Sequence, residues 1–279
     1  NLNFLVYVVN CICSGCCYVY TVGSMFAGIG GICLGFKQAG FQIVWANEKD
    51  PAACRTYRHN FGNEYLVEAD IIKLDKVQIP HFDILTAGFP CQPFSLAGPH
   101  RGFGDVRGNL FFQIIDVAKI TQPRVIFLEN VANLIDHDNG KTFITMFNAL
   151  AEIGYILRYQ NLSSHVYGNS PQTRNRTYVV AFKDESLAVK FKYPDAINLT
   201  TGIFDIIDKR IQQKSIYYYT PEDPFYKYVV SKVKRTDSIY RVHDSGIHLA
   251  KNQTCPTLTA SMGTRNNRVP VIIDNFGYR

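Results

Sequence analysis

A cysteine held between two prolines is the residue of this 279-residue chain best placed to do chemistry. Cys91 follows Pro90 and lies two residues before Pro93, just after an apolar run over residues 82–87 that predicts a buried strand. Because proline restricts the backbone, we expect the thiol on a stiff turn at the strand end. A lone cysteine is more often a buried packing residue, but a strand-end turn is where a nucleophile is expected. We therefore predict that Cys91 is a catalytic nucleophile.

A glycine-rich turn near the N-terminus predicts a site for a nucleotide-type cofactor. Residues 18–26 predict a strand, residues 27–31 (Ala-Gly-Ile-Gly-Gly) a turn and residues 32–39 a helix. Glycines at a helix N-terminus let a ligand approach the backbone. Glu48 and Asp70 follow at the next two strand ends, a layout that could bind an adenosine along one edge of a sheet. A dehydrogenase would use the same layout, so this region does not define the reaction.

Strands and helices alternate over about 165 residues, which predicts one α/β domain with a doubly wound sheet. Further helices are expected at 51–60, 110–120 and 141–153, and further strands at 42–46, 124–128, 155–163 and 177–182. Beyond Asp184 the helical periodicity fades, and tyrosines mix with basic residues. We expect a catalytic domain at 18–185, a smaller irregular domain at 186–279, and an undefined apolar extension at 1–17.

The distribution of charge indicates a class of binding partner, and the cysteine content indicates the redox compartment. The net charge of the chain is +6. Residues 183–279 contain 15 Lys and Arg and 10 Asp and Glu, so this segment carries +5 of the net charge. That basic region is the predicted polyanion-binding surface, although an ordinary solvated surface is the alternative. Cys13 and Cys16 lack a second pair, so no metal site is expected. The scattered remaining cysteines favour a reducing cytoplasm, and the apolar extension is short for a membrane span.

Several motifs, in one order along the chain, resemble those of the C5-cytosine DNA methyltransferases of bacterial restriction-modification systems. The resemblance covers about residues 20–270, and its motifs lie at 26–31, 88–95, 129–131, 172–176 and 255–260. It implies a Rossmann-like, S-adenosylmethionine-dependent methyltransferase sheet with a smaller, irregular target-recognition domain. It also implies methyl transfer from S-adenosylmethionine to C5 of a cytosine flipped out of double-stranded DNA.

The resemblance assigns roles residue by residue. Cys91 would add to cytosine C6, Glu129 would hold a proton for N3, and Arg176, supported by Arg174, would hold O2. The cofactor-binding residues that it implies are Phe26, Gly28, Gly30, Gly31, Glu48, Asp70, Ile71, Pro90 and Leu110. The DNA contacts that it implies are Gln92, Ser95, Ala97, Arg101, Arg107, Asn130, Thr257 and Thr259.

Three departures from the family pattern leave alternatives open. Ser24 stands where many members carry an acidic residue, and Lys49 where a tryptophan that stacks on adenine is frequent. The family's C-terminal return segment does not follow, which suggests a truncated enzyme or one part of a split enzyme with a complementing polypeptide. A transfer-RNA cytosine-C5 methyltransferase and an inactive DNA- or cofactor-binding remnant are the rival interpretations. We expect action on DNA in the bacterial cytoplasm, with a cognate restriction endonuclease and no membrane partner.

Overall fold

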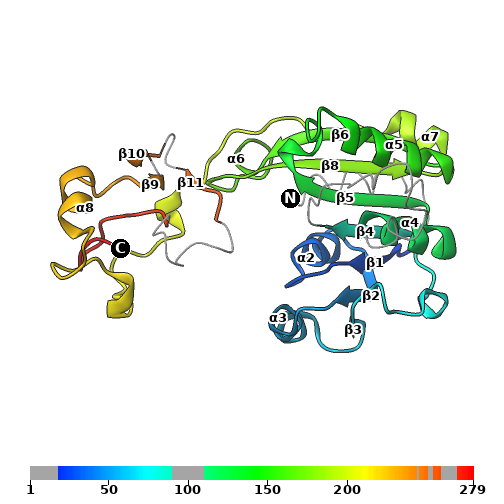
Figure 1. The fold of residues 1–279 in the computed structure, drawn as a ribbon, viewed down its shortest axis with the longest axis horizontal. Helices are drawn as coiled ribbons and strands as arrows, with labels where there is room; N and C mark the ends of the chain where they lie inside the picture. The colour runs from blue at the N-terminus through cyan, green and yellow to red at the C-terminus, as the bar shows by residue number, and fades with distance from the viewer. Residues whose placement is uncertain (1–17, 90–109, 244, 251–253, 259–268) are drawn as a thin grey trace, which may run out of the picture. The chain divides into compact units, whose positions relative to one another are not determined.

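A seven-stranded sheet in the order β3-β2-β1-β4-β5-β8-β6 forms the centre of the larger part of the chain (Figure 1). The computed structural model describes residues 18–89, 110–243, 245–250, 254–258 and 269–279. The strands of this sheet are β1 (Thr21–Met25), β2 (Gln42–Glu48), β3 (Leu66–Glu68), β4 (Ile84–Gly88), β5 (Val125–Val131), β6 (Ile156–Ser163) and β8 (Asn175–Phe182). The strands from β3 to β5 pair in parallel, whereas β8 runs antiparallel to β5.

The strand order confirms the predicted doubly wound α/β fold. The chain first moves outward from β1 to β3 and then returns to continue from β4 to β5 on the other side of β1. In such sheets, ligands bind outside the carboxyl ends of the strands where the order reverses. The reversal lies between β1 and β4, whose ends carry the glycine turn and the segment that leads to Cys91.

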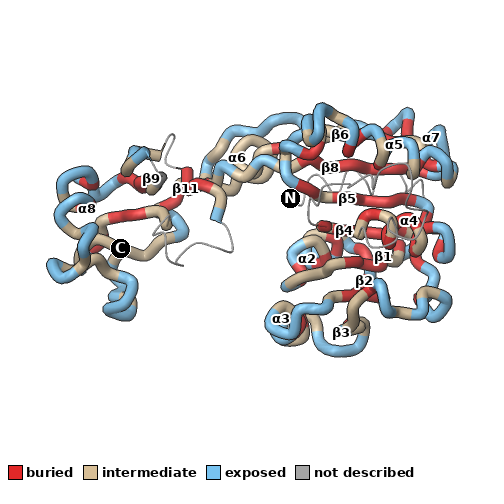
Figure 2. The backbone as a smooth tube through the Cα atoms, viewed as in Figure 1, coloured by how far each residue is buried: buried red, intermediate tan, exposed pale blue. Residues whose placement is uncertain are grey.

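Helices cover both faces of the sheet. Alternate residues of a strand point to opposite sides, and consecutive residues of the central strands are buried, so both faces pack against other elements. Leu85 and Leu128 share a buried cluster with Ile114 of α4. Phe127 instead packs edge-on against Phe36 of α2, with ring centroids 5.4 Å apart. The helices α2 and α4 therefore lie on opposite faces, and the central strands between them are buried (Figure 2). The helices of this unit are α2 (Gly31–Gln38), α3 (Pro51–Phe61), α4 (Leu110–Thr121), α5 (Lys141–Glu152) and α7 (Glu185–Lys190).

Local sequence signals fix both ends of α3. The Asp50 side chain accepts a hydrogen bond from the Ala53 N–H at 2.7 Å and caps α3, and Pro51 occupies the first turn. Gly62, with φ of 81°, ends the same helix in a conformation that favours glycine. These bounds agree with the helix predicted at 51–60.

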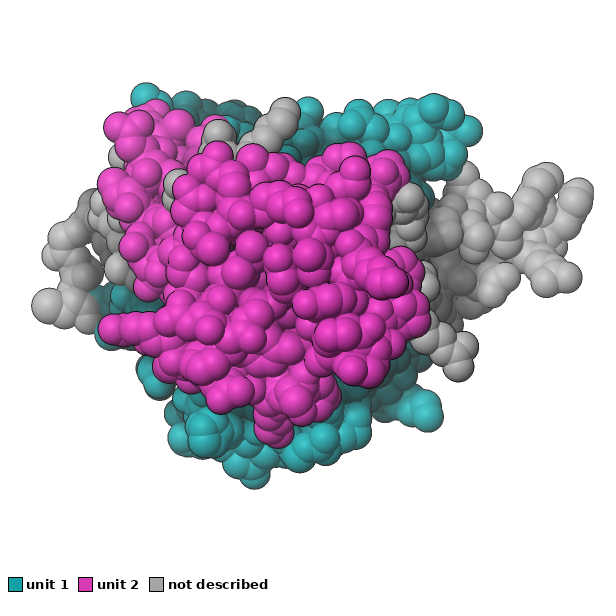
Figure 3. All heavy atoms as spheres, turned by 90° about the vertical axis from the view of Figure 1, so that its left-hand side faces the viewer, with its two compact units in different colours: residues 1–162, 175–194 teal, residues 163–174, 195–279 magenta. Residues whose placement is uncertain are grey.

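Residues 163–174 and 195–279 form a second compact unit, apart from the sheet unit of residues 1–162 and 175–194 (Figure 3). Its regular structure is sparse: β9 pairs antiparallel with β10, and β7 pairs parallel with β11. Two small apolar clusters, one around Ile239 and one around Val271, form its core. Its elements are α6 (Ser164–Tyr167), β7 (Gln172–Thr173), η4 (Ile203–Asp205), η5 (Ser215–Tyr217), α8 (Tyr226–Lys232), β9 (Tyr240–His243), β10 (Gly246–Leu249) and β11 (Cys255–Pro256).

Two short 3₁₀ helices, η1 (Lys76–Gln78) and η3 (Ala132–Leu134), complete the sheet unit. No helix in the parts of the chain that the structure describes is long and apolar enough to cross a bilayer. The predicted apolar extension at 1–17 lies outside the described residues, and the predicted domain limits at 185 and 186 remain predictions.

Candidate functional site

The predicted glycine turn connects β1 to α2 through a strained backbone. Phe26, Gly28 and Gly30 all have positive φ, of 53°, 56° and 92°. A Cβ at Gly30 would lie 2.2 Å from the ring of Phe61, so that glycine is required for space as well as for its dihedral angle. A positive φ at a bulky residue such as Phe26 is rare and is often found at functional sites.

Glu48 ends β2 beside this turn, with its carboxylate held by backbone groups. Oε2 accepts a hydrogen bond from the Gly28 N–H at 2.9 Å. Oε1 accepts from the N–H groups of Lys49 and Asp50, at 2.8 and 2.9 Å. Because three donors fix the carboxylate, its orientation is set before any ligand arrives, and further lone pairs remain for hydroxyl donors.

Asn47, which the sequence analysis did not single out, holds the turn that carries Asp70. The Asn47 side chain is 1% exposed, and its Nδ2 donates to the carbonyl oxygens of Val67 and Ala69 at 3.1 and 2.9 Å. Asp70 follows directly and accepts from the Ile72 N–H through Oδ1 at 3.1 Å. Its position next to the Glu48 motif was the only sequence signal for a role of this asparagine.

A cavity of about 360 Å³ brings together six of the nine predicted cofactor-binding residues. They are Phe26, Gly28, Glu48, Asp70, Ile71 and Leu110, joined by the unpredicted Asn47, Lys49, Ala69 and Gly88. Gly30 and Gly31 line a separate cavity of about 460 Å³ with residues of α2 and α3. Because the sequence analysis predicts a nucleoside cofactor at these residues, the cavity of about 360 Å³ is called the nucleoside pocket below.

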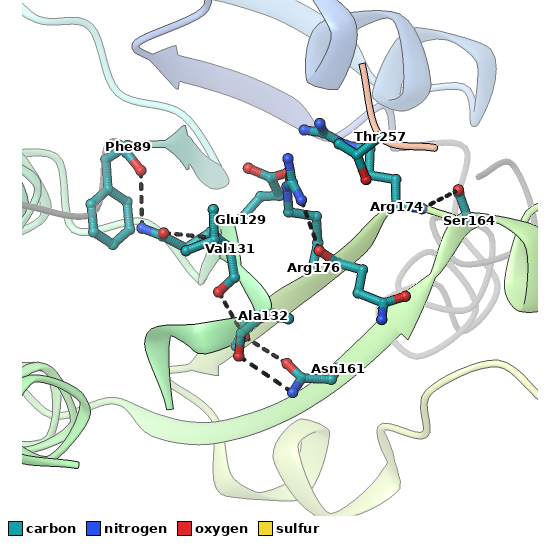
Figure 4. Close-up of polar contacts among 12 residues, drawn as sticks. Phe89, Glu129, Val131, Ala132, Asn161, Ser164, Arg174, Arg176 and Thr257 are labelled. Carbon is teal, nitrogen blue, oxygen red and sulfur yellow. Dashed lines mark hydrogen bonds and ion pairs between the residues drawn. The ribbon is translucent and has the colours of Figure 1, made fainter. Parts of the chain in front are cut away.

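A second group of predicted residues lies where β4, β5 and β8 meet. Arg176 of β8 pairs with Glu129 of β5, with Nε 3.0 Å from Oε1 (Figure 4). Both side chains are largely buried, at 16% and 19% exposure. Gly88 and Glu129 are register partners on neighbouring strands, and a Cβ at Gly88 would lie 3.6 Å from Glu129 Oε2. The ion pair therefore lies beside the end of β4, at Gly88 of the nucleoside pocket.

Asn130 and Thr177 hold this strand end in place. Asn130 Nδ2 donates to the Phe89 carbonyl at 2.9 Å, which fixes the backbone two residues before Cys91. The Thr177 hydroxyl lies 3.2 Å from the Val131 carbonyl oxygen and 2.6 Å from Asn161 Oδ1. The described contacts of Asn130 are thus with the protein, and its predicted contact with DNA remains a prediction.

Arg174 and Thr257 belong to the second unit. The Arg174 carbonyl accepts from the Ser164 N–H at 3.0 Å. Thr257 follows β11, and its hydroxyl donates to the Thr173 carbonyl at 2.7 Å. The predicted support of Arg176 by Arg174 remains a prediction. The predicted residues Pro90, Cys91, Gln92, Ser95, Ala97, Arg101, Arg107 and Thr259 lie outside the described residues.

The described cysteines are poor nucleophiles. Burial raises the pKa of the Cys33 thiol, which accepts a hydrogen bond from the Tyr57 hydroxyl at 3.6 Å. Burial also raises the pKa of Cys255 to about 11 and the pKa of Cys54 above its ordinary value. Since the thiolate is the reactive form, none of these three side chains suits covalent catalysis at neutral pH.

A glycine turn and a fixed carboxylate lie at the reversal of the doubly wound sheet, which is the arrangement of Rossmann-like nucleotide-binding folds. The comparisons with known proteins agree. The C-5 cytosine-specific DNA methylase family matches residues 20–274, and the chain belongs to this family.

The similar curated proteins carry the name of type II methyltransferases. The chain is 41% identical to M.Bsp6I of Bacillus sp. (strain RFL6) over 261 residues, which cover 92% of this chain and 82% of that protein. It is 39% identical to M.NgoBI of Neisseria gonorrhoeae over 72% of this chain, and 39% identical to M.HhaI of Haemophilus parahaemolyticus over 66%. These two matches cover only 61% and 55% of the relatives' own lengths.

Solved structures show the same fold at lower identity. The Dnmt2 methyltransferase of S. pombe aligns over 78% of this chain and 67% of that chain, with a TM-score of 0.56 and 22% identity. A putative DNA modification methyltransferase encoded within an E. coli prophage aligns over 87% of this chain and 73% of that chain, with a TM-score of 0.51 and 24% identity. The chain thus shares the fold of these structures and belongs to the C-5 cytosine-specific DNA methylase family.

Proposed function

We propose that the chain binds S-adenosylmethionine in the nucleoside pocket and methylates C5 of a cytosine flipped out of double-stranded DNA, with Cys91 as the nucleophile. The observation that carries this proposal is the Glu129–Arg176 pair beside Gly88, three residues before Cys91. One carboxyl group and one guanidinium at the end of the strand that leads to a cysteine are the groups needed to polarise a pyrimidine ring under attack.

The residues of the nucleoside pocket fit a nucleoside cofactor. Glu48, fixed by three backbone donors, offers lone pairs to the two ribose hydroxyls. A Cβ at Gly28 would meet no atom within 4 Å and would extend into space needed by a ligand. Asp70 offers a carboxylate to the amino group of adenine. When bound there, S-adenosylmethionine would supply an electrophilic methyl group on a sulfonium sulfur.

The chain's own residues would then activate the cytosine. The Cys91 thiolate adds to C6 and forms a carbon–sulfur bond, while Glu129 gives a proton to N3 and Arg176 holds O2. The ring electrons released by this addition make C5 nucleophilic. Once C5 carries the methyl group, its proton is lost to solvent, the C5–C6 double bond reforms, Cys91 is expelled and Glu129 recovers its proton.

For the DNA substrate, the support is the family match together with the net +5 charge of residues 183–279. The relatives carry type II methyltransferase names. From these names we infer that the chain acts in a restriction-modification system in the bacterial cytoplasm, together with a cognate endonuclease.

Covalent trapping tests the proposal. The chain is incubated with mixed-sequence duplex DNA in which every cytosine is 5-fluorocytosine, with and without S-adenosylmethionine. Since fluorine cannot leave as the proton does, the adduct should persist on denaturing gels, and only when the cofactor is present. Cys91→Ser should form none yet still bind S-adenosylhomocysteine, which shows that the variant is folded.

Two controls accompany the trapping experiment. Unsubstituted duplex should give no stable adduct, and labelled methyl transfer to duplex DNA should exceed transfer to transfer RNA. An adduct that survives Cys91→Ser would contradict the assigned nucleophile. Preferential methylation of transfer RNA would support the RNA enzyme, and cofactor binding without transfer to either substrate would indicate the inactive remnant.

A further inference from the structure

Lys49 gives the nucleoside pocket a positive charge next to its carboxylates. The residue follows β2 directly, lines the pocket, and has a side chain that is 62% exposed. Its Nζ lies 3.6 Å from Asp70 Oδ2. The backbone N–H of Lys49 is already used by Glu48 Oε1, so the residue is fixed at its base while its ammonium group extends to Asp70.

The two oxygens of Asp70 are therefore unequal. Oδ1 accepts from the Ile72 N–H at 3.1 Å, within the turn. Oδ2 faces the Lys49 ammonium, and it is the oxygen left for the amino group of a bound purine. Any ligand donor at this position must share Oδ2 with Lys49 or displace the ammonium.

We propose that Lys49 is a specificity-determining residue of the nucleoside pocket, which lets the pocket accept a 6-oxo purine nucleoside as well as the 6-amino one. This inference rests on the proposed function. A carboxylate alone accepts from a 6-amino group and repels a 6-oxo group. The Lys49–Asp70 pair offers an acceptor and a donor together, because the ammonium can donate to the oxo group after leaving Asp70.

The expected effect is modest, because the ion pair is exposed. Pairs of this kind correspond to changes of about 1.4- to 5-fold in an equilibrium constant. Replacing Lys49 with methionine keeps a chain of similar length and removes the competing ammonium. S-adenosylhomocysteine should bind about 1.4- to 5-fold more tightly, and its 6-oxo counterpart, S-inosylhomocysteine, should bind more weakly.

The experiment is calorimetric titration of the full chain with these two ligands at 50 mM and 500 mM NaCl. The measured quantity is the ratio of the two dissociation constants, which should shift in favour of the 6-amino ligand in Lys49→Met. The shift should shrink at 500 mM NaCl, where screening is stronger. Lys73→Met is the matched control: this exposed lysine lies on the same turn, with its backbone N–H bound to the Asp70 carbonyl.

The outcomes distinguish a failure of the inference about Lys49 from a failure of the proposed function. A ratio that shifts in Lys49→Met and not in Lys73→Met supports the inference. An unchanged ratio, or an equal shift in both variants, overturns it while leaving the proposed function in place. A wild-type chain that binds neither ligand at high protein concentration would overturn both the inference and the assignment of the pocket.

Discussion

The side chain of Asn47 should be the most sensitive support of the nucleoside pocket. It is 1% exposed and donates to two carbonyl oxygens, of Val67 and Ala69, in the chain that leads to Asp70. Asn47→Ala removes both hydrogen bonds and leaves the two acceptors without their side-chain donor. At about 0.5–1.5 kcal/mol for each bond, the expected loss is about 1–3 kcal/mol of folding free energy.

The loss should be visible as a fall in melting temperature. For domains of 150–250 residues, 1 kcal/mol corresponds to about 2–4 °C, so Asn47→Ala should melt about 2–12 °C below the wild type. Because the Asp70 turn loosens as well, S-adenosylhomocysteine should bind more weakly. The control is Asn198→Ala, which changes an exposed asparagine.

The variant Asn47→Asp adds a dependence on pH. Its carboxyl group would be buried against two carbonyl oxygens, which raises its folded pKa above the unfolded value. A group with a raised pKa stabilises the fold below its unfolded pKa and loses that contribution as pH rises through the folded pKa. The deficit relative to the wild type should therefore be smaller at pH 4 than at pH 8. Wild-type melting and binding in both variants would refute the assigned role of the amide.

Three further predictions concern neighbouring groups. Gly30→Ala should lower the melting temperature by several degrees, because the new Cβ would lie 2.2 Å from the Phe61 ring and because the φ of 92° is unfavourable for alanine. Gly31→Ala is the control and should melt like the wild type, since no atom lies within 4 Å of its new Cβ. Equal melting curves for the two variants would contradict the packing argument. Glu48→Gln should weaken S-adenosylhomocysteine binding about tenfold or more, measured by calorimetry, because an amide nitrogen must then face a backbone N–H. Alkylation of the native chain at pH 8, mapped by mass spectrometry, should leave Cys33 and Cys255 unmodified, since burial raises the pKa of both; labelling as fast as in the denatured chain would contradict this.

Local signals made much of the sheet unit predictable. The helix at Pro51 begins with a capping aspartate and a proline and ends at Gly62, all adjacent in sequence. The glycine turn and Glu48 could be paired because a short βαβ unit returns to the same edge of the sheet. Each of these features depends on residues within one strand–helix–strand unit, which is the range over which sequence patterns carry information.

Features that depend on distant segments were not predictable. The antiparallel direction of β8 follows from its pairing with β5, and no local pattern distinguishes it from a parallel strand. The role of Asn47 requires the position of β3, and the contact of Lys49 with Asp70 spans two strand ends. The inclusion of residues 163–174 in the second unit depends on the pairing of β7 with β11, about 80 residues later in the chain.

The antiparallel strand β8 begins only two residues after the short strand β7, which pairs with β11. Thr173, which pairs with Pro256 and accepts from Thr257, is followed after only two residues by Arg176. Three residues of fully extended chain span at most about 11 Å. The backbone therefore connects the β7–β11 pair to the Glu129–Arg176 ion pair through a short stretch of chain.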